Sequence, residues 1–201
     1  NYLVELSHSV DEIHELNQMM KEAGLRLDEF IRNILNYSRN SRLSISYQTF
    51  NVKVMVDEIV NNLKYMKGFE QVKIIRDIRE EKVHHDLERV KVILGSLVSN
   101  GIKYFDTSKT DSFVKISVVD NEDYLILKVE DNGEGIAEEH LPNLFEMFFT
   151  ASLRAKGSGI GLYILKDAVN MLRGEIEVHS KVEVGTEFII KLPVVSPIKN
   201  K

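Results

Sequence analysis

The sequence contains no cysteine, which excludes disulfide bridges and thiolate metal sites. Basic residues are not in excess, because 26 lysines and arginines are interspersed with 31 acidic residues. A nucleic-acid-binding protein needs a basic face, so we expect no nucleic acid as a partner. No apolar run approaches the roughly 20 residues that cross a bilayer, and no signal peptide is visible, so we expect no membrane segment.

The residues that are present suit one substantial core. The 201 residues are 43% hydrophobic and 28% charged, enough for one core and a small additional element. The chain begins at Asn1 rather than at a methionine, which predicts a piece of a longer protein. We expect this piece to be cytoplasmic, while a membrane anchor or sensor would lie in the missing part.

The first forty residues read as helical, with no proline and a single glycine, Gly24. Their apolar residues recur at three- and four-residue steps and form one stripe: Ile13, Leu16, Met20, Leu27, Phe30, Ile31, Ile34 and Leu35. A lone helix with an exposed apolar stripe would be unstable. We therefore expect it to pack on a partner helix, either within the chain or across a dimer.

From about residue 44 the pattern becomes mixed. Alternation and turn residues predict strands over 45–47, 72–75, 113–119, 124–130, 175–179 and 187–192, and helices over 52–63, 86–103 and 160–172. Asp86 is the expected N-cap of the second of these helices, and Gly174 the expected C-cap of the third. The histidines, including the adjacent His84 and His85, are expected to be surface or partly packed residues rather than metal ligands.

An acidic residue stands where an apolar strand runs into a glycine turn, in the segment Val129-Glu130-Asp131-Asn132-Gly133-Glu134-Gly135-Ile136. A carboxylate at Asp131 could accept a hydrogen bond from the exocyclic amine of a purine. Gly133 would let the ring approach the backbone. Taken alone, Asp131-Asn132-Gly133 is equally well read as a plain turn, because such sequences are common turn formers.

Three glycines alternate directly before the last predicted helix, in Gly157-Ser158-Gly159-Ile160-Gly161-Leu162. Their missing Cβ atoms allow amides to point at phosphate oxygens, and the helix N-terminus adds partial positive charge. The spacing is not that of a dinucleotide fingerprint, and the lysine of a P-loop is missing. The alternative interpretation is a flexible loop before a helix.

Asn100, Lys103 and Tyr104 are spaced to share one helical face. The amide oxygen of Asn100 suits a magnesium ion that bridges phosphates, Lys103 offers a positive charge, and Tyr104 could stack on a base. For these three alone, a solvated helix end is the better interpretation. Together with the two glycine segments they favour a nucleotide site. The apolar run 145–149 before a polar stretch could serve as the hinge of a covering loop.

Five motifs in this order resemble those of the catalytic ATP-binding domain of sensor histidine kinases, over about residues 50–195. They are the helix ending at Asn100, Asp131-x-Gly133-x-Gly135, Phe145-Glu146-Met147-Phe148, Gly157-x-Gly159-x-Gly161-Leu162, and Gly185-Thr186. The resemblance implies an α+β fold, the two-layer α/β sandwich (Bergerat fold) shared with gyrase, Hsp90 and MutL. It also implies ATP and Mg²⁺ as cofactors, with the ATP held under a mobile lid.

The resemblance further implies a role for each matching residue. Asn100 would hold Mg²⁺, Lys103 would meet phosphate and Tyr104 would flank the base. Asp131 would bind the adenine amine, with Thr186 behind the ring. The surrounding residues would be Gly133, Gly135 and Ile136 at the base, Phe145 and Phe148 beside the lid, and Gly157, Ser158, Gly159, Gly161 and Leu162 at the phosphates.

Residues 1–43 resemble part of the dimerisation and phosphotransfer hairpin, and residues 44–201 the catalytic domain. The family's phosphate-accepting histidine is followed by an acidic residue and usually Arg-Thr-Pro, and no such stretch exists here. Ser7-His8-Ser9-Val10-Asp11 imitates it weakly and lacks the proline. We therefore expect no catalytic residue within the fragment, which should bind ATP yet fail to autophosphorylate. The full-length protein would be a homodimer with a response regulator as partner.

Two other functions remain open from the sequence. One is a degenerate, nucleotide-sensing dimerisation module. The other is an ATPase of the gyrase or Hsp90 type, or a serine kinase of the anti-sigma class. Such ATPases carry a glutamate near the metal-binding asparagine to activate water. Ser96 occupies the matching place, four residues before Asn100, which disfavours that alternative.

Overall fold

The computed structural model describes residues 44–121, 123–150 and 158–194, and positions 13, 14, 16–21, 23, 24, 27, 30 and 31. Those N-terminal positions are all helical, and the apolar side chains of Ile13, Leu16 and Met20 are exposed. The extent of the predicted helix, the segment around His8 and the domain boundary at residue 43 lie outside the described residues. Gly157 lies outside them too.

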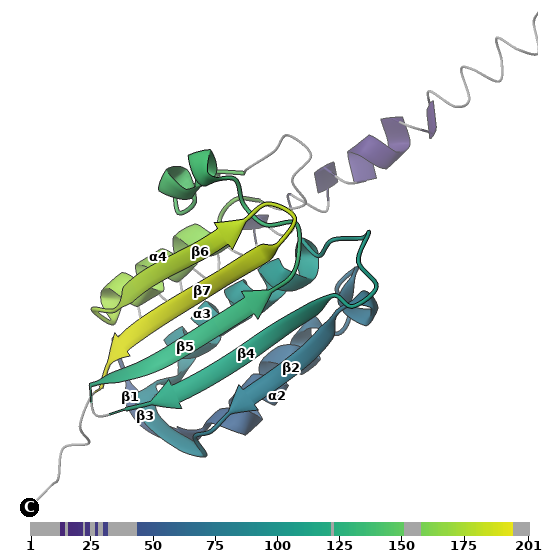
Figure 1. Cartoon of the computed structure of the whole chain (residues 1–201). Helices are drawn as coiled ribbons and strands as arrows, with labels where there is room; N and C mark the ends of the chain where they lie inside the picture. Colours follow the sequence, from purple (N-terminus) through teal and green to yellow (C-terminus); the bar gives the residue numbers. More distant parts are fainter. Residues whose placement is uncertain are drawn as a thin grey trace, which may run out of the picture.

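A five-stranded sheet forms one layer of the molecule (Figure 1). Its strand order is β2-β4-β5-β7-β6, with β2 parallel to β4 and the other neighbours antiparallel. The strands are β2 (Lys73–Ile78), β4 (Phe113–Asp120), β5 (Tyr124–Asp131), β6 (Glu175–Lys181) and β7 (Gly185–Pro193). The segments predicted as strands over 113–119 and 124–130 pair as the antiparallel hairpin β4–β5, and those over 175–179 and 187–192 as β6–β7.

Helices form the second layer and cover one face of the sheet (Figure 1). They are α2 (Val52–Leu63), α3 (Leu87–Lys103) and α4 (Gly161–Met171). Two 3₁₀ turns, η1 (Phe69–Gln71) and η2 (Glu138–Asn143), and a small antiparallel sheet of β1 (Tyr47–Asn51) and β3 (Lys82–Asp86) complete the described elements. The predicted two-layer α/β sandwich is therefore confirmed for the part of the chain described.

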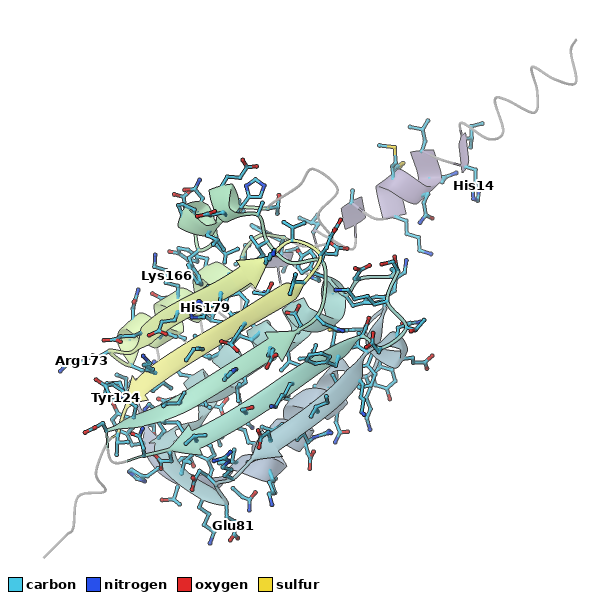
Figure 2. All side chains as sticks on the ribbon, viewed as in Figure 1. His14, Glu81, Tyr124, Lys166, Arg173 and His179 are labelled. Carbon is cyan, nitrogen blue, oxygen red and sulfur yellow. The ribbon has the colours of Figure 1, made fainter. Side chains whose placement is uncertain are left out.

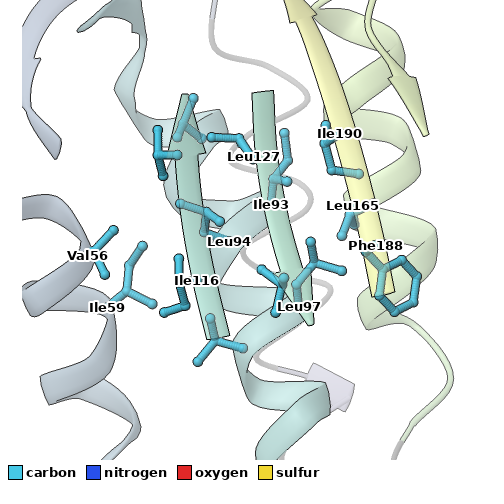
Figure 3. Packing of buried hydrophobic residues seen from close by; sticks show 14 of the residues in the cluster. Val56, Ile59, Ile93, Leu94, Leu97, Ile116, Leu127, Leu165, Phe188 and Ile190 are labelled. Carbon is cyan, nitrogen blue, oxygen red and sulfur yellow. The ribbon is translucent and has the colours of Figure 1, made fainter. Parts of the chain in front are cut away.

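The core lies between the two layers, with α3 at its centre (Figure 3). Ile93, Leu94 and Leu97 of α3 are at most 1% exposed, and their neighbours include Ile116 of β4 and Leu127 of β5. This burial follows from the period of each element, because alternate strand residues and one helix stripe face inward. It holds α3 against β4 and β5.

The other face of the sheet is polar, and polar side chains such as that of His179 lie on it (Figure 2). Cross-strand ion pairs run along this face, including Lys191 with Glu177 at 2.6 Å and Lys115 with Asp77 at 3.5 Å. Such pairs suit the solvated side of an antiparallel sheet.

Two predictions about the edges of the fold are wrong. The first strand is not 45–47 but Tyr47–Asn51, because it pairs along its whole length with β3, which was not predicted. His85 lies within β3 and is buried at 1% exposure, contrary to the expected surface or partly packed position.

The C-cap of α4 is also not where the sequence predicts it. Leu172 is the C-cap, and the left-handed residue that follows is Arg173, with φ of 56°. The amide of Gly174 donates to Val169, as in a Schellman motif. A side chain at Gly174 would collide with Leu192 and with the carbonyl of Lys191, so close packing explains the glycine.

Candidate nucleotide site

The first part of the site is the C-terminal end of α3. Asp86 caps the other end of this helix, accepting the amide of Arg89 at 2.9 Å as predicted. Asn100 and Lys103 lie in the last helical turn and are half-buried. Tyr104 is the C-cap and not a helical residue, so the prediction that the three share one helical face is wrong for Tyr104.

Asp131 ends β5 beside this part of α3. A Cβ built on Gly101, the neighbour of Asn100, would lie 3.5 Å from the Cβ of Asp131. The Oδ1 atom of Asp131 accepts the amides of Gly133 at 2.9 Å and Thr186 at 3.3 Å. Within the described residues, its Oδ2 atom accepts no hydrogen bond.

Burial raises the pKa of Asp131 above its ordinary value of 3.8, and this is the largest influence on it. The amides of Gly133 and Thr186 and the charge of Lys109 act in the opposite direction, while Glu130 adds to the rise. The carboxylate is therefore partly desolvated while one oxygen remains available to a donor. Such a group is typical of a binding site.

The turn after Asp131 is seated on the end of α3. The amide of Glu134 donates to the carbonyl of Tyr104 at 2.9 Å. A side chain on Gly133 would collide with that same carbonyl. Gly135 has φ of 70° and packs against the carbonyl of Lys181 in β6, where no other residue would fit without strain. Both glycines are thus required by the close approach of two backbones.

Ser180 joins this turn to the closing hairpin, and the sequence reasoning missed it. Its Oγ accepts the amide of Ile136 at 2.8 Å, donates to the carbonyl of Gly185 at 3.0 Å, and lies 2.8 Å from the Oγ1 of Thr186. Thr186 is buried and its amide reaches Asp131. An inward-facing polar residue on an otherwise apolar strand face is the signal that could have identified Ser180.

The glycine-rich segment lies along the middle of α3. The Oγ of Ser96 donates to the carbonyl of Gly161 at 3.0 Å, which holds the start of α4 one helical turn before Asn100. Gly159 has φ of 68°, and its carbonyl accepts the amide of Phe148 at 3.0 Å. The start of α4 is therefore held against α3, the helix that carries Asn100.

The remaining predicted residues surround this centre. Phe145, Ile136 and Leu162 are partly buried and pack against the core. Phe148 has φ of 68° and is 56% exposed, so it does not fill the core. Ser158 is half-buried at the edge of the described residues.

Comparison with known proteins decides the family. The family described as "Histidine kinase-, DNA gyrase B-, and HSP90-like ATPase" matches residues 85–196, more than half of the chain. The chain belongs to this ATPase family. The match begins within β3 and runs just past β7, so it includes α3, the Asp131 turn and the closing hairpin.

A curated relative of the chain is a sensor protein. The sensor protein SrrB of Staphylococcus aureus (strain NCTC 8325 / PS 47) is 30% identical over 192 residues. The match covers 91% of this chain and 32% of the relative, so the chain spans about a third of that protein's length. The sequence-based resemblance is confirmed, because the chain carries the catalytic ATP-binding domain of a sensor histidine kinase.

Solved structures show the same fold. Histidine kinase AdeS of Acinetobacter baumannii matches with a TM-score of 0.68 and 24% identity, over 90% of this chain and 82% of that chain. Full-length ShkA, solved in complex with AMPPNP, matches with a TM-score of 0.71 and 18% identity, over 92% and 40% respectively. Among the residues described here, no helix is both long enough and apolar enough to cross a membrane.

Proposed function

We propose that the chain binds ATP with Mg²⁺ and donates the γ-phosphoryl group to a histidine of its parent protein, from which a response-regulator aspartate receives it. The environment of Asp131 is the main support for this proposal. One carboxylate oxygen accepts two backbone amides, and the other accepts no hydrogen bond within the described residues. A carboxylate oxygen in a partly desolvated site suits the amine of adenine.

Residues near Asp131 would bind the phosphates and the metal ion of the nucleotide. Asn100, next to Gly101, would give its amide oxygen to Mg²⁺, and Lys103 would meet a phosphate. Among the described residues no three histidine or acidic side chains gather to hold a metal, so phosphate oxygens and water would supply the ion's other ligands. Bound Mg²⁺ would neutralise phosphate charge, while the chain contributes position and electrostatics.

The chain itself supplies no acceptor under this proposal. None of its six histidines is followed by the acidic residue and Arg-Thr-Pro of the family's acceptor. In the transfer, the bond between the γ-phosphorus and the bridging oxygen breaks to leave ADP, and a nitrogen–phosphorus bond forms on a histidine outside this sequence. Dimerisation through residues 1–43 would bring that histidine within reach. Ser96 donates a hydrogen bond to the carbonyl of Gly161, and a hydroxyl does not replace the carboxylate of a water-activating glutamate.

Calorimetric titration of ATP with Mg²⁺ tests the binding. Replacing Asp131 by Asn should weaken ATP binding roughly 10- to 150-fold, because a hydrogen bond to a charged group is worth about 1.5–3 kcal/mol. Asp120→Asn is the matched control, because burial raises the pKa of Asp120 too. Asp131 pairs with Val114 at the start of β4, whereas Asp120 is the last residue of β4. Equal ATP affinity in wild type and Asp131→Asn would overturn the proposed site.

Labelled ATP tests the transfer. The chain alone should take up no label, whereas a histidine-bearing dimerisation hairpin of the parent protein, added separately, should become labelled. Label on His8 would contradict the proposal that the acceptor lies elsewhere. Steady release of free phosphate without any labelled histidine would favour an ATPase.

A further inference from the structure

Lys109 lies on the loop between α3 and β4, and its ammonium group binds two other turns. The Nζ atom donates to the carbonyls of Asn132 at 2.7 Å and Glu183 at 2.6 Å, and lies 3.5 Å from that of Val184. The first carbonyl directly follows Asp131, and the other two belong to the β6–β7 turn. One side chain therefore joins three loops beside the candidate site.

The loop itself holds Lys109 in place. The carbonyl of Asp106 accepts the amide of Lys109 at 3.2 Å, and its Oδ2 atom lies 3.8 Å from the ammonium. The Oδ1 atom of Asp106 accepts the amide of Ser108 at 2.9 Å and its hydroxyl at 2.6 Å. The Lys109 side chain is 24% exposed. It is thus oriented by its own turn, which reduces the entropy lost when its contacts form.

The residue after Asp131 is also fixed from the same loop. The Oδ1 atom of Asn132 accepts the amide of Phe113 at 2.8 Å, and its Nδ2 donates to the carbonyl of Asp111 at 3.2 Å. With Lys109 on the carbonyl, both the side chain and the main chain of Asn132 are bound by residues 109–113. A displacement of this loop would therefore move the turn that carries Asp131.

We propose that Lys109 is a positioning residue for nucleotide binding, which holds the Asp131 turn against the β6–β7 turn. The inference rests on the proposed function. It goes beyond a structural role because Lys109 binds the carbonyl of Asn132, the residue directly after the proposed ligand-binding carboxylate. The charge of Lys109 also lowers the pKa of Asp131, whereas burial and Glu130 raise it. A purely structural lysine would influence stability, but neither ATP affinity nor its pH dependence.

The test compares ATP binding by wild type, Lys109→Met, Lys109→Arg and the control Lys115→Met. Lys115 pairs with Asp77 on the polar face of the sheet, away from the helices. Lys109→Met should bind ATP about tenfold more weakly, the loss expected for charge-assisted hydrogen bonds. As the pH falls, Lys109→Met should also lose ATP binding at a higher pH than wild type does. Without the positive charge of Lys109, the carboxylate of Asp131 is protonated more readily. Lys115→Met should match wild type in both measurements.

Lys109→Arg separates charge from geometry. Arginine keeps the positive charge, so ATP binding should be lost at about the same acidic pH as in wild type. Its planar fork cannot reproduce the lysine's contacts, so part of the affinity should still be lost. Using the same nucleotide for every variant cancels the titration of the phosphates, and unfolding midpoints establish that each variant is folded during the titration.

The outcomes separate the two proposals. If wild type binds ATP and Lys109→Met binds it equally well at every pH, the positioning role is wrong while the proposed function stands. A variant that is only less stable, with unchanged affinity and pH dependence, leads to the same conclusion. If wild type itself binds no ATP, the proposed function fails, and the inference fails with it.

Discussion

The two ends of α3 each lie beside an aspartate, and the two carboxylates are treated differently. At the N-terminal end Asp86 is 2% exposed and both of its oxygens are bound. Its Oδ1 accepts the amide of Arg89, and its Oδ2 accepts the Arg89 guanidinium at 2.7 Å and the amide of Ser46 at 2.9 Å. At the other end Asp131 uses only one oxygen and has no ion-pair partner among the described residues.

This difference separates a carboxylate that holds the fold from one that, under the proposed function, binds a ligand. Asp86 joins β1, β3 and α3, is buried, and has a partner on each of its two oxygens. The carboxylate of Asp131 is partly desolvated, and within the described residues only one of its oxygens accepts hydrogen bonds. Under the proposed function, the amine of the nucleotide would donate to the other oxygen. Substitutions at the two ends should therefore have opposite signatures, one in stability and the other in binding.

The largest expected effect is the loss of the buried cation at the N-terminal end. Arg89→Met should lower the free energy of unfolding by about 3–5 kcal/mol, because the charge of Asp86 remains buried without its partner. Urea unfolding measures the loss. Lys91→Met is the matched control, since Lys91 pairs with Glu58 at a more exposed site, where about 0–1 kcal/mol is expected.

Asp131→Asn should show the reverse pattern in the same assay. Its free energy of unfolding should stay within about 1 kcal/mol of wild type, because the amide oxygen can still accept the two backbone amides. A loss as large as that of Arg89→Met would show that Asp131 holds the fold as Asp86 does, and the comparison between the two ends would fail.

A loss of stability smaller than that of Arg89→Met is expected at Ser180, which supports the ligand end from behind. Ser180→Ala removes the acceptor of the Ile136 amide and the donor to Gly185. We expect a loss of about 1–3 kcal/mol in unfolding free energy and several-fold weaker ATP binding. Ser117→Ala, on the polar face of β4, should change neither. Unaltered ATP binding in Ser180→Ala would show that the hydrogen bonds behind Asp131 do not position it.

Local signals in the sequence were enough for most of the elements. The helix predicted over 52–63 has the same bounds in the structure, where the side chain of Asn51 caps its start. The β4 and β5 strands were predicted from alternation, with Asn121 accepting two amides in the turn between them. Both kinds of signal depend only on neighbours in the chain.

The missed features depend on distant partners. β3 is a strand because β1 pairs with it across about thirty intervening residues, and this pairing also buries His85. Lys109 looks like any surface lysine until its loop, the Asp131 turn and the β6–β7 turn meet. Arg173 adopts a left-handed conformation against its intrinsic preference, because it occupies the left-handed position of the Schellman motif that ends α4. The glycine stands one residue later, where packing leaves no space for a side chain.

The smallest expected effect is a difference in the pH dependence of stability at the two ends. Burial lowers the pKa of His85 below its ordinary 6.5, so the unfolded chain takes up a proton before the folded one. Stability from neutral His85 is therefore complete above about pH 6.5 and declines as the pH falls below it. Asp131 acts in the opposite sense, because its raised pKa lets the folded chain bind a proton first as the pH approaches 3.8 from above.

Urea unfolding from about pH 8 to about pH 5 separates these contributions. His85→Gln should flatten the decline in stability below about pH 6.5, by less than about 1 kcal/mol. His179→Gln, at an exposed position of β6, should leave the decline as it is in wild type. If His85→Gln and wild type lose stability in parallel, the buried histidine does not set the acid sensitivity of this end, and the hydrogen bond from its ring to Pro193 serves packing alone.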